Sequence, residues 1–241
     1  MICEILFRCP HCGEGAALNS LPFCKRCVGN LLVAPPLCPK CFSPNCLGVD
    51  AKCERPWAAD GLSPITSLSA AYLLQGKTFS VLKSWKKNRA WLSDRRIFRF
   101  SEHVWRALTE FQPEYVSCVP QRFSRAWQMG GGPTEALSRF LARRLGIPFV
   151  QLLSPGVRTS FRQGELQGTA RIQNPITFEG QLTIPPHARL LWVDDFITTG
   201  HTLRRSAQCL REIGFLGPIH GMALGMRMRH RAEEAPSSNN P

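Results

Sequence analysis

The 241-residue chain has no run of apolar residues that approaches the ~18 needed for a membrane-spanning helix. Its first residues also lack the basic-then-apolar pattern of a secretory signal peptide. We therefore expect a cytoplasmic protein without membrane insertion. Only 20% of the residues are charged and 44% are hydrophobic, which excludes wholesale disorder. The length and composition predict one ordinary domain together with a smaller module.

Cysteine is nearly absent from most of the chain, since only Cys118 and Cys209 follow residue 53, and the other nine lie within the first 53 residues. Positive charge is distributed the other way. Residues 1–60 carry 6 basic and 5 acidic side chains, whereas residues 61–241 carry 24 and 12. This contrast predicts a cysteine-rich module at residues 1–56 and a basic domain at residues 66–230. Residues 231–241 end without large apolar side chains and are expected to form a disordered tail.

Apolar segments alternate with amphipathic segments in the second module. Short strands are expected at residues 115–119, 149–153, 190–193 and about 219–224. Helices are expected at residues 134–145, ended by Gly146, and at 202–213, ended by Gly214. This alternation predicts an α/β fold with a mostly parallel sheet flanked by helices. Ligands of such sheets bind at the carboxyl ends of the strands.

The cysteine-rich module contains spacings that are typical of zinc sites. Two Cys-x2-Cys pairs are separated by eleven residues, and each pair can place two thiolates on one side of a tight turn. A second set has one such pair and one more widely spaced pair. A reducing compartment favours metal ligation over disulfides, although redox use of the pairs is an alternative. We expect one or two structural zinc ions, held by Cys9, Cys12, Cys24 and Cys27 and by Cys38, Cys41, Cys46 and Cys53.

The most informative segment reads Leu-Leu-Trp-Val-Asp-Asp-Phe-Ile-Thr-Thr-Gly-His-Thr and spans residues 190–202. An apolar strand ends in two carboxylates, and a turn rich in hydroxyls and glycine opens a helix. Backbone N–H groups at a helix start bind anions, while the carboxylates suit ribose hydroxyls or hydrated Mg²⁺. The alternative is an ordinary threonine-capped helix with solvated acids. The candidate residues are Asp194 and Asp195 for the sugar and Thr198, Thr199, Gly200, His201 and Thr202 for the phosphate.

This segment resembles the signature of the type I phosphoribosyltransferases, which is an apolar strand, two acidic residues and Thr-Thr-Gly-x-Thr. The resemblance implies that fold, with Asp194 and Asp195 as catalytic residues on the ribose of phosphoribosyl pyrophosphate. It also implies that residues 198–202 hold the 5′-phosphate and that Mg²⁺ binds the pyrophosphate. A double zinc ribbon joined to such a domain resembles the ComF family, over the range from Cys9 to about Met226. That family is implicated in competence and DNA uptake in bacteria.

One segment departs from the family pattern. Where the family usually reads Arg-Gly-Phe-Asn-Gln, residues 129–133 read Met-Gly-Gly-Gly-Pro. By analogy, the polar groups that are missing here lie near the pyrophosphate. Three functions stay open. They are phosphoribosyl transfer in DNA uptake, a non-catalytic module that senses the ligand and binds single-stranded DNA, and nucleobase salvage by an enzyme with an attached zinc ribbon. Single-stranded DNA and competence proteins are the expected macromolecular partners.

Basic and aromatic side chains are interleaved between residues 77 and 106, where nine Lys or Arg accompany two acidic residues. Such a mixture suits single-stranded nucleic acid, because cations follow the backbone and aromatic faces stack on bases. The alternative is a pair of amphipathic helices with aromatic residues in the core. The candidate nucleic-acid contacts are Lys83, Lys86, Lys87 and Arg89.

Overall fold

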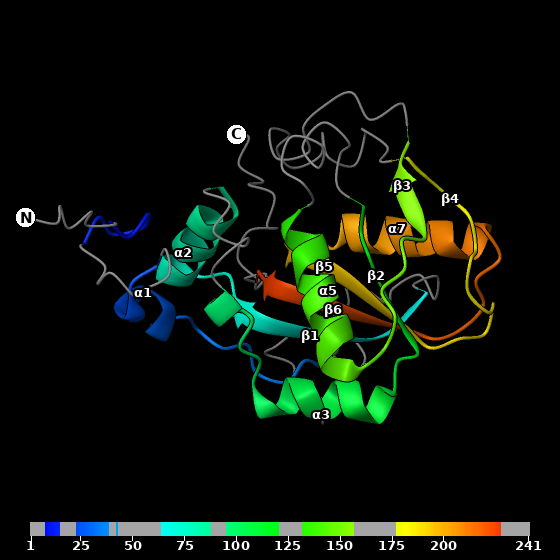
Figure 1. The fold of residues 1–241 in the computed structure, drawn as a ribbon, viewed down its shortest axis with the longest axis horizontal. Coiled ribbons are helices and arrows are strands. Elements are labelled where there is room, and N and C mark those ends of the chain that lie inside the picture. The colour runs from blue at the N-terminus through cyan, green and yellow to red at the C-terminus, as the bar shows by residue number, and fades with distance from the viewer. Residues whose placement is uncertain are drawn as a thin grey trace, which may run out of the picture.

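The computed structural model describes residues 8–14, 23–38, 42, 64–87, 95–120, 132–156 and 177–227. Figure 1 shows the arrangement of the elements in these ranges. No helix in these ranges has the length and hydropathy needed to cross a membrane. In chain order the elements are α1 (Lys25–Gly29), β1 (Ile65–Leu73), α2 (Gly76–Lys87), the 3-10 helix η2 (Arg95–Ile97), α3 (Glu102–Phe111), β2 (Tyr115–Cys118), α5 (Pro133–Leu145), β3 (Leu153–Pro155), β4 (Phe178–Gly180), β5 (Leu190–Ile197), α7 (His201–Glu212) and β6 (Ile219–Met226).

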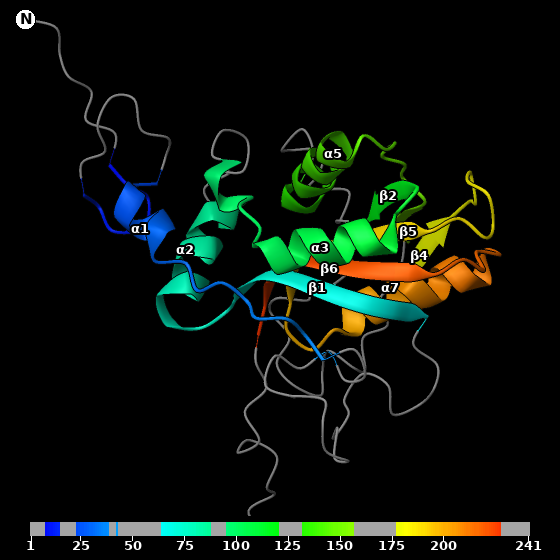
Figure 2. The same cartoon turned by 90° about the horizontal axis from the view of Figure 1, so that it is seen from below.

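Four parallel strands form the main sheet, in the order β1-β6-β5-β2. Parallel neighbours need long crossover connections, and helices provide them here. Figure 2 shows α3 and α5 on one face of this sheet and α7 on the other. A separate antiparallel pair, β3 with β4, lies beside it. The predicted α/β class with a mostly parallel sheet and flanking helices is confirmed.

The side chains of β5 show why this strand is buried on both faces. Leu190 and Trp192 belong to the hydrophobic cluster that contains the apolar face of α7. Leu191 and Val193 belong to the opposite cluster, which contains residues of α3 and α5. All four side chains have no exposed surface. Successive residues of a strand point to opposite faces, so a continuous apolar run fills both layers at once.

Most of the elements predicted from the sequence are found. β2, β5 and β6 include or overlap the expected strands, and α5 ends at Gly146 in the left-handed conformation. The prediction of a strand at residues 149–153 is wrong. Only Phe149 forms a parallel bridge, to Val116, and the chain then turns into β3, which pairs antiparallel with β4. The apolar run is divided between two different pairing partners, which periodicity does not reveal.

The cysteine-rich segment is joined to the sheet through the outer edge of β1. Val33 forms an antiparallel bridge with Tyr72. The backbone N–H of Leu73 donates to the carbonyl of Leu32 over 2.9 Å, and the N–H of Ala34 donates to Ala71 over 3.0 Å. The expected module boundary at residues 56–66 lies mostly outside the described residues, and the tail at 231–241 lies wholly outside them. These boundaries stay predictions.

Candidate functional site

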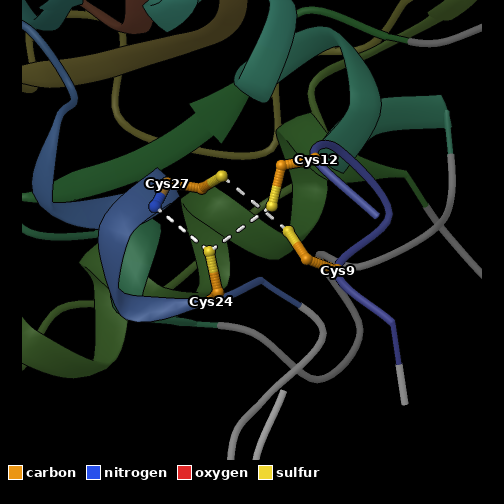
Figure 3. Close-up of side chains that lie close together, drawn as sticks. All are labelled: Cys9, Cys12, Cys24 and Cys27. Atoms are coloured by element: carbon orange, nitrogen blue, oxygen red, sulfur yellow. Dashed lines mark hydrogen bonds between the residues drawn. The ribbon is translucent and has the colours of Figure 1, made fainter. Parts of the chain in front are cut away.

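Four cysteines lie together beside α1, and their sulfur atoms are all within 4.8 Å of one another. Figure 3 shows these side chains converging from two turns of the chain. The Sγ atoms of Cys9 and Cys27 are 3.8 Å apart, and those of Cys12 and Cys24 are 3.7 Å apart. A tetrahedral zinc ion with Zn–S bonds of about 2.3 Å requires S–S separations of about 3.8 Å. The spacing of the four thiols therefore fits zinc.

Local backbone geometry explains how the two Cys-x2-Cys pairs reach this arrangement. Cys24 is the N-cap of α1, and its sulfur accepts a hydrogen bond of 3.4 Å from the N–H of Cys27. The first pair lies in a turn in which the N–H of Gly13 donates to the carbonyl of Cys9. Gly13 has φ of 74°, a conformation that glycine adopts at little cost. Both turns place two sulfurs on one side.

The thiols of this cluster influence one another's ionisation. Burial opposes ionisation of Cys9, but three backbone N–H groups outweigh it and lower its pKa to about 7. Burial raises the pKa of Cys27, and the neighbouring cysteines raise it further. Four thiolates in so small a volume repel one another unless a cation lies among them. The donor set is therefore suited to a structural zinc ion with no ligand position left open.

The second cysteine set is described only in part. Cys38 is buried, and its carbonyl accepts a hydrogen bond from the N–H of Phe42. Cys41, Cys46 and Cys53 lie outside the described residues, so the second zinc site stays a prediction. Cys118 and Cys209 are buried free thiols, as expected from their apolar surroundings.

The two acidic residues lie near the carboxyl end of β5 and are both buried. Oδ1 of Asp194 accepts a hydrogen bond of 2.8 Å from the N–H of Asp195. Oδ1 of Asp195 accepts one of 2.7 Å from the N–H of Phe196. Burial, followed by the adjacent charge of Asp195, raises the pKa of Asp194 to about 7. Two neighbouring carboxylates with little solvent are costly unless a ligand or cation uses them.

Lys86 of α2 reaches into this acidic pair. Its Nζ lies 2.5 Å from Oδ2 of Asp195 and 5.1 Å from the centroid of the Phe196 ring. In Figure 1 the arrowheads of β1 and β6 point toward the side where α2 lies, so α2 stands at the carboxyl ends of these strands. The sequence analysis predicted that Lys86 contacts nucleic acid. No local sequence pattern indicated its contact with Asp195.

The turn after β5 has the geometry expected of an anion-binding helix start. Gly200 is the N-cap of α7 with φ of 73°, and as a glycine it has no side chain to cap the helix. Thr199 is exposed, whereas Thr198, His201 and Thr202 are half-buried. The N–H of His201 lies 3.4 Å from Oγ1 of Thr199. A helix start presents backbone N–H groups that bind anions, and this one lies at the same strand end as the acidic pair.

The residues predicted to contact nucleic acid do not all have the same surroundings in the structure. Lys83 and Lys87 are exposed on α2, Lys86 contacts Asp195, and Arg89 lies outside the described residues. Trp85 is completely buried and packs edge-to-face on Phe98, so neither ring is available for stacking on bases. The exposed aromatic ring of α2 is Phe79, which the sequence did not single out.

Comparison with known proteins gives one curated relative. The chain is 25% identical over 233 residues to Competence protein F of Haemophilus influenzae, covering 86% of this chain and 92% of that protein. The resemblance to the ComF family is confirmed. No protein-family model matches the chain.

Phosphoribosyltransferases are among the solved structures that align with the chain. The xanthine-guanine-hypoxanthine enzyme of Helicobacter pylori shares 17% identity over 70% of this chain and 89% of its own, with a TM-score of 0.37. The adenine enzyme of Saccharomyces cerevisiae shares 17% identity over 61% and 69%, also with a TM-score of 0.37. The purine enzyme of Pyrococcus horikoshii shares 17% identity over 65% and 94%, with a TM-score of 0.35.

Proposed function

We propose that this protein binds phosphoribosyl pyrophosphate with Mg²⁺ at the end of β5 and acts in bacterial DNA uptake in the cytoplasm. The observation that carries the proposal is the presence of two buried carboxylates and a helix start with a glycine N-cap at one strand end. A sugar phosphate has both of the groups that this arrangement suits. The similarity to Competence protein F supports the role in DNA uptake.

Each part of the site has a distinct task in this proposal. Asp194 and Asp195 accept hydrogen bonds from ribose hydroxyls. The backbone N–H groups and threonine hydroxyls of residues 198–202 bind the 5′-phosphate. Carboxylate oxygens are also suitable ligands for Mg²⁺, which when bound neutralises charge on a pyrophosphate group. If the protein turns over, these groups orient the sugar for displacement of pyrophosphate at the anomeric carbon.

Calorimetry of phosphoribosyl pyrophosphate binding tests the proposal directly. The parent protein is expected to bind the ligand with Mg²⁺, and the double variant Asp194→Asn with Asp195→Asn is expected to lose binding. Glu110→Gln, which removes a charge from an exposed position on α3, serves as the control and should bind like the parent. Equal binding by the parent and the double variant would exclude this site.

A turnover assay distinguishes an enzyme from a ligand sensor. Pyrophosphate release is measured with each nucleobase under conditions in which the ligand is bound. Sustained release establishes phosphoribosyl transfer. Binding without release from any base supports the sensing function, which is in keeping with the loss of the family's Arg, Asn and Gln at positions 129, 132 and 133.

The exposed face of α2 favours binding of single-stranded DNA as a second function. Phe79 is 42% exposed, and Nζ of Lys83 lies 5.9 Å from the centroid of its ring. Lys77 and Lys87 are also exposed on this helix. A ring available for stacking among cations matches the requirements of a single-stranded nucleic acid.

A salt titration of oligonucleotide binding tests this second function. Affinity should fall steeply as salt increases, because phosphate contacts release counterions. Phe79→Ala should weaken binding by about tenfold, the value of one stacked base. Leu216→Ala, at another exposed apolar position, is the matched control. A salt slope near zero would contradict DNA binding by this face.

A further inference from the structure

Lys86 stands out because it is a cation from α2 that contacts the acidic pair on β5. Its stem extends from a helix that is fixed in the core by the buried side chains of Val81, Leu82 and Trp85. Its ammonium group is held between a carboxylate oxygen at 2.5 Å and an aromatic ring at 5.1 Å. The side chain of Lys86 is 32% exposed and that of Asp195 only 8%, so the contact is shielded on one side and open on the other.

The acidic pair presents an electrostatic problem for an anionic ligand. Two carboxylates beside a phosphate site repel the phosphate, and low solvent access strengthens that repulsion. A cation that stays with the pair reduces this repulsion before any ligand arrives. Lys86 is such a cation, since its ammonium group forms an ion pair with Asp195. Of the basic residues on α7, Arg205 is instead paired with Glu212.

We propose that Lys86 is the built-in counter-cation of the acidic pair, and that it positions Asp195 for an anionic sugar ligand without requiring Mg²⁺ for that step. The proposal rests on the proposed sugar-phosphate function for its ligand. Lys86 is a positioning residue here, because it acts through Asp195. Removal of its charge makes sugar-phosphate binding dependent on a divalent cation, which then takes the place of the ammonium group.

The ligand experiment uses ribose 5-phosphate, which has no pyrophosphate to carry Mg²⁺ into the site. Without Mg²⁺, Lys86→Met should weaken binding of ribose 5-phosphate by about tenfold or more, because the acidic pair then repels the phosphate without a counter-charge. One close opposite charge changes an equilibrium of a carboxyl group by roughly this factor. Added Mg²⁺ should restore most of that loss. Lys86→Arg should bind nearly like the parent, and Lys77→Met, at an exposed position on the same helix, controls for loss of one charge.

A second measurement needs no ligand and therefore separates the two proposals. Carbon NMR of the Asp194 carboxyl follows its titration in the parent, Lys86→Met and Lys86→Arg, each checked for folding by thermal denaturation. The charge of Lys86 lowers the pKa of Asp194, so the titration of Asp194 should move to higher pH in Lys86→Met by about one unit or more, and it should not move in Lys86→Arg.

The outcomes can be distinguished. A shifted titration with no ribose 5-phosphate binding by the parent would overturn the proposed function and leave the counter-cation in place. An unchanged titration, or parent-like binding by Lys86→Met without Mg²⁺, would overturn the counter-cation. If Lys86→Met does not fold, Lys86→Gln replaces it in both measurements.

Discussion

The indole Nε1 of Trp192 donates a hydrogen bond of 2.9 Å to Oγ of Ser206, and both side chains are completely buried. Trp192 precedes the acidic pair on β5, and Ser206 lies on α7, which follows the glycine turn. Ser206 in turn donates to the carbonyl of Leu203 over 2.9 Å. This contact fixes the strand and the helix on either side of the candidate phosphate turn.

Ser206→Ala should therefore destabilise the protein, because it leaves the buried N–H of Trp192 without this acceptor. The expected loss in the free energy of unfolding is about 1–3 kcal/mol. Urea denaturation followed by tryptophan fluorescence measures it. Ser80→Ala, at a more exposed position on α2, should cost much less. Equal effects of the two variants would show that the Trp192 hydrogen bond contributes little.

Gly200→Ala should lower both stability and sugar-phosphate binding, because φ of 73° strains a side chain with a Cβ atom. The expected cost is about 1–2 kcal/mol. Gly146 ends α5 with φ of 70°, and a Cβ atom added there would have open space within 4 Å. Gly146→Ala should thus share the loss of stability and keep ligand binding. Loss of binding in both variants would indicate a general effect of destabilisation.

Cys24→Ser should remove one zinc ion and unfold the cysteine-rich segment, since structural zinc contributes on the order of 10 kcal/mol to small metal-binding folds. Metal analysis of the purified protein, with denaturation in the presence of a chelator, measures both effects. Cys209→Ala changes a buried cysteine outside the cluster and should leave the zinc content unchanged. Unchanged zinc in Cys24→Ser would contradict the tetrahedral site.

His220 should make the protein less stable in mild acid. It is buried between the hydroxyls of Ser67 and Ser69, at 2.6 and 3.0 Å, and burial lowers its pKa to about 4. The unfolded state then binds more protons between the unfolded pKa of 6.5 and about 4. The stability contributed by neutral His220 is complete above pH 6.5 and falls as the pH drops through this window, by roughly 3 kcal/mol in total.

The measurement compares the pH dependence of unfolding in the parent and in His220→Asn. The stability difference between them should decrease from about pH 6.5 to about pH 4. Asp194 acts in the opposite direction over much of this window, because its raised pKa makes the folded state bind more protons. Working with the difference between the two proteins removes that contribution. A pH-independent difference would contradict a neutral buried His220.

Asp194→Asn should stabilise the protein near and above pH 7 while it abolishes ligand binding. The folded pKa of Asp194, about 7, lies above its unfolded value of 3.8, so stability falls as the pH rises through that window. Replacing the acid removes this cost. Thermal denaturation at about pH 8, above the folded pKa, measures the gain. A lower melting temperature for the variant would show that the Asp194 carboxylate does not destabilise the fold.

The predictions from the sequence were most accurate for features whose residues lie close together along the chain. The strand, acidic pair and glycine turn at residues 190–202 lie in one continuous segment, and the four clustered cysteines follow a spacing that a single ion imposes. The contact between Lys86 and Asp195 could not be predicted, because it joins two elements that are distant in the chain. The sequence did not decide whether Trp85 is buried or stacks on bases, for the same reason. Which side of α2 is buried depends on how this helix packs on the core.

The segment at residues 31–34 also affects how separate molecules of this protein meet. It occupies the peptide groups along the outer border of β1, and these groups would otherwise be open to a strand of another molecule. The same segment follows the cysteine cluster directly. Loss of the metal would release this covering segment, so metal depletion is expected to expose the edge of β1 and to cause the protein to associate with its own copies.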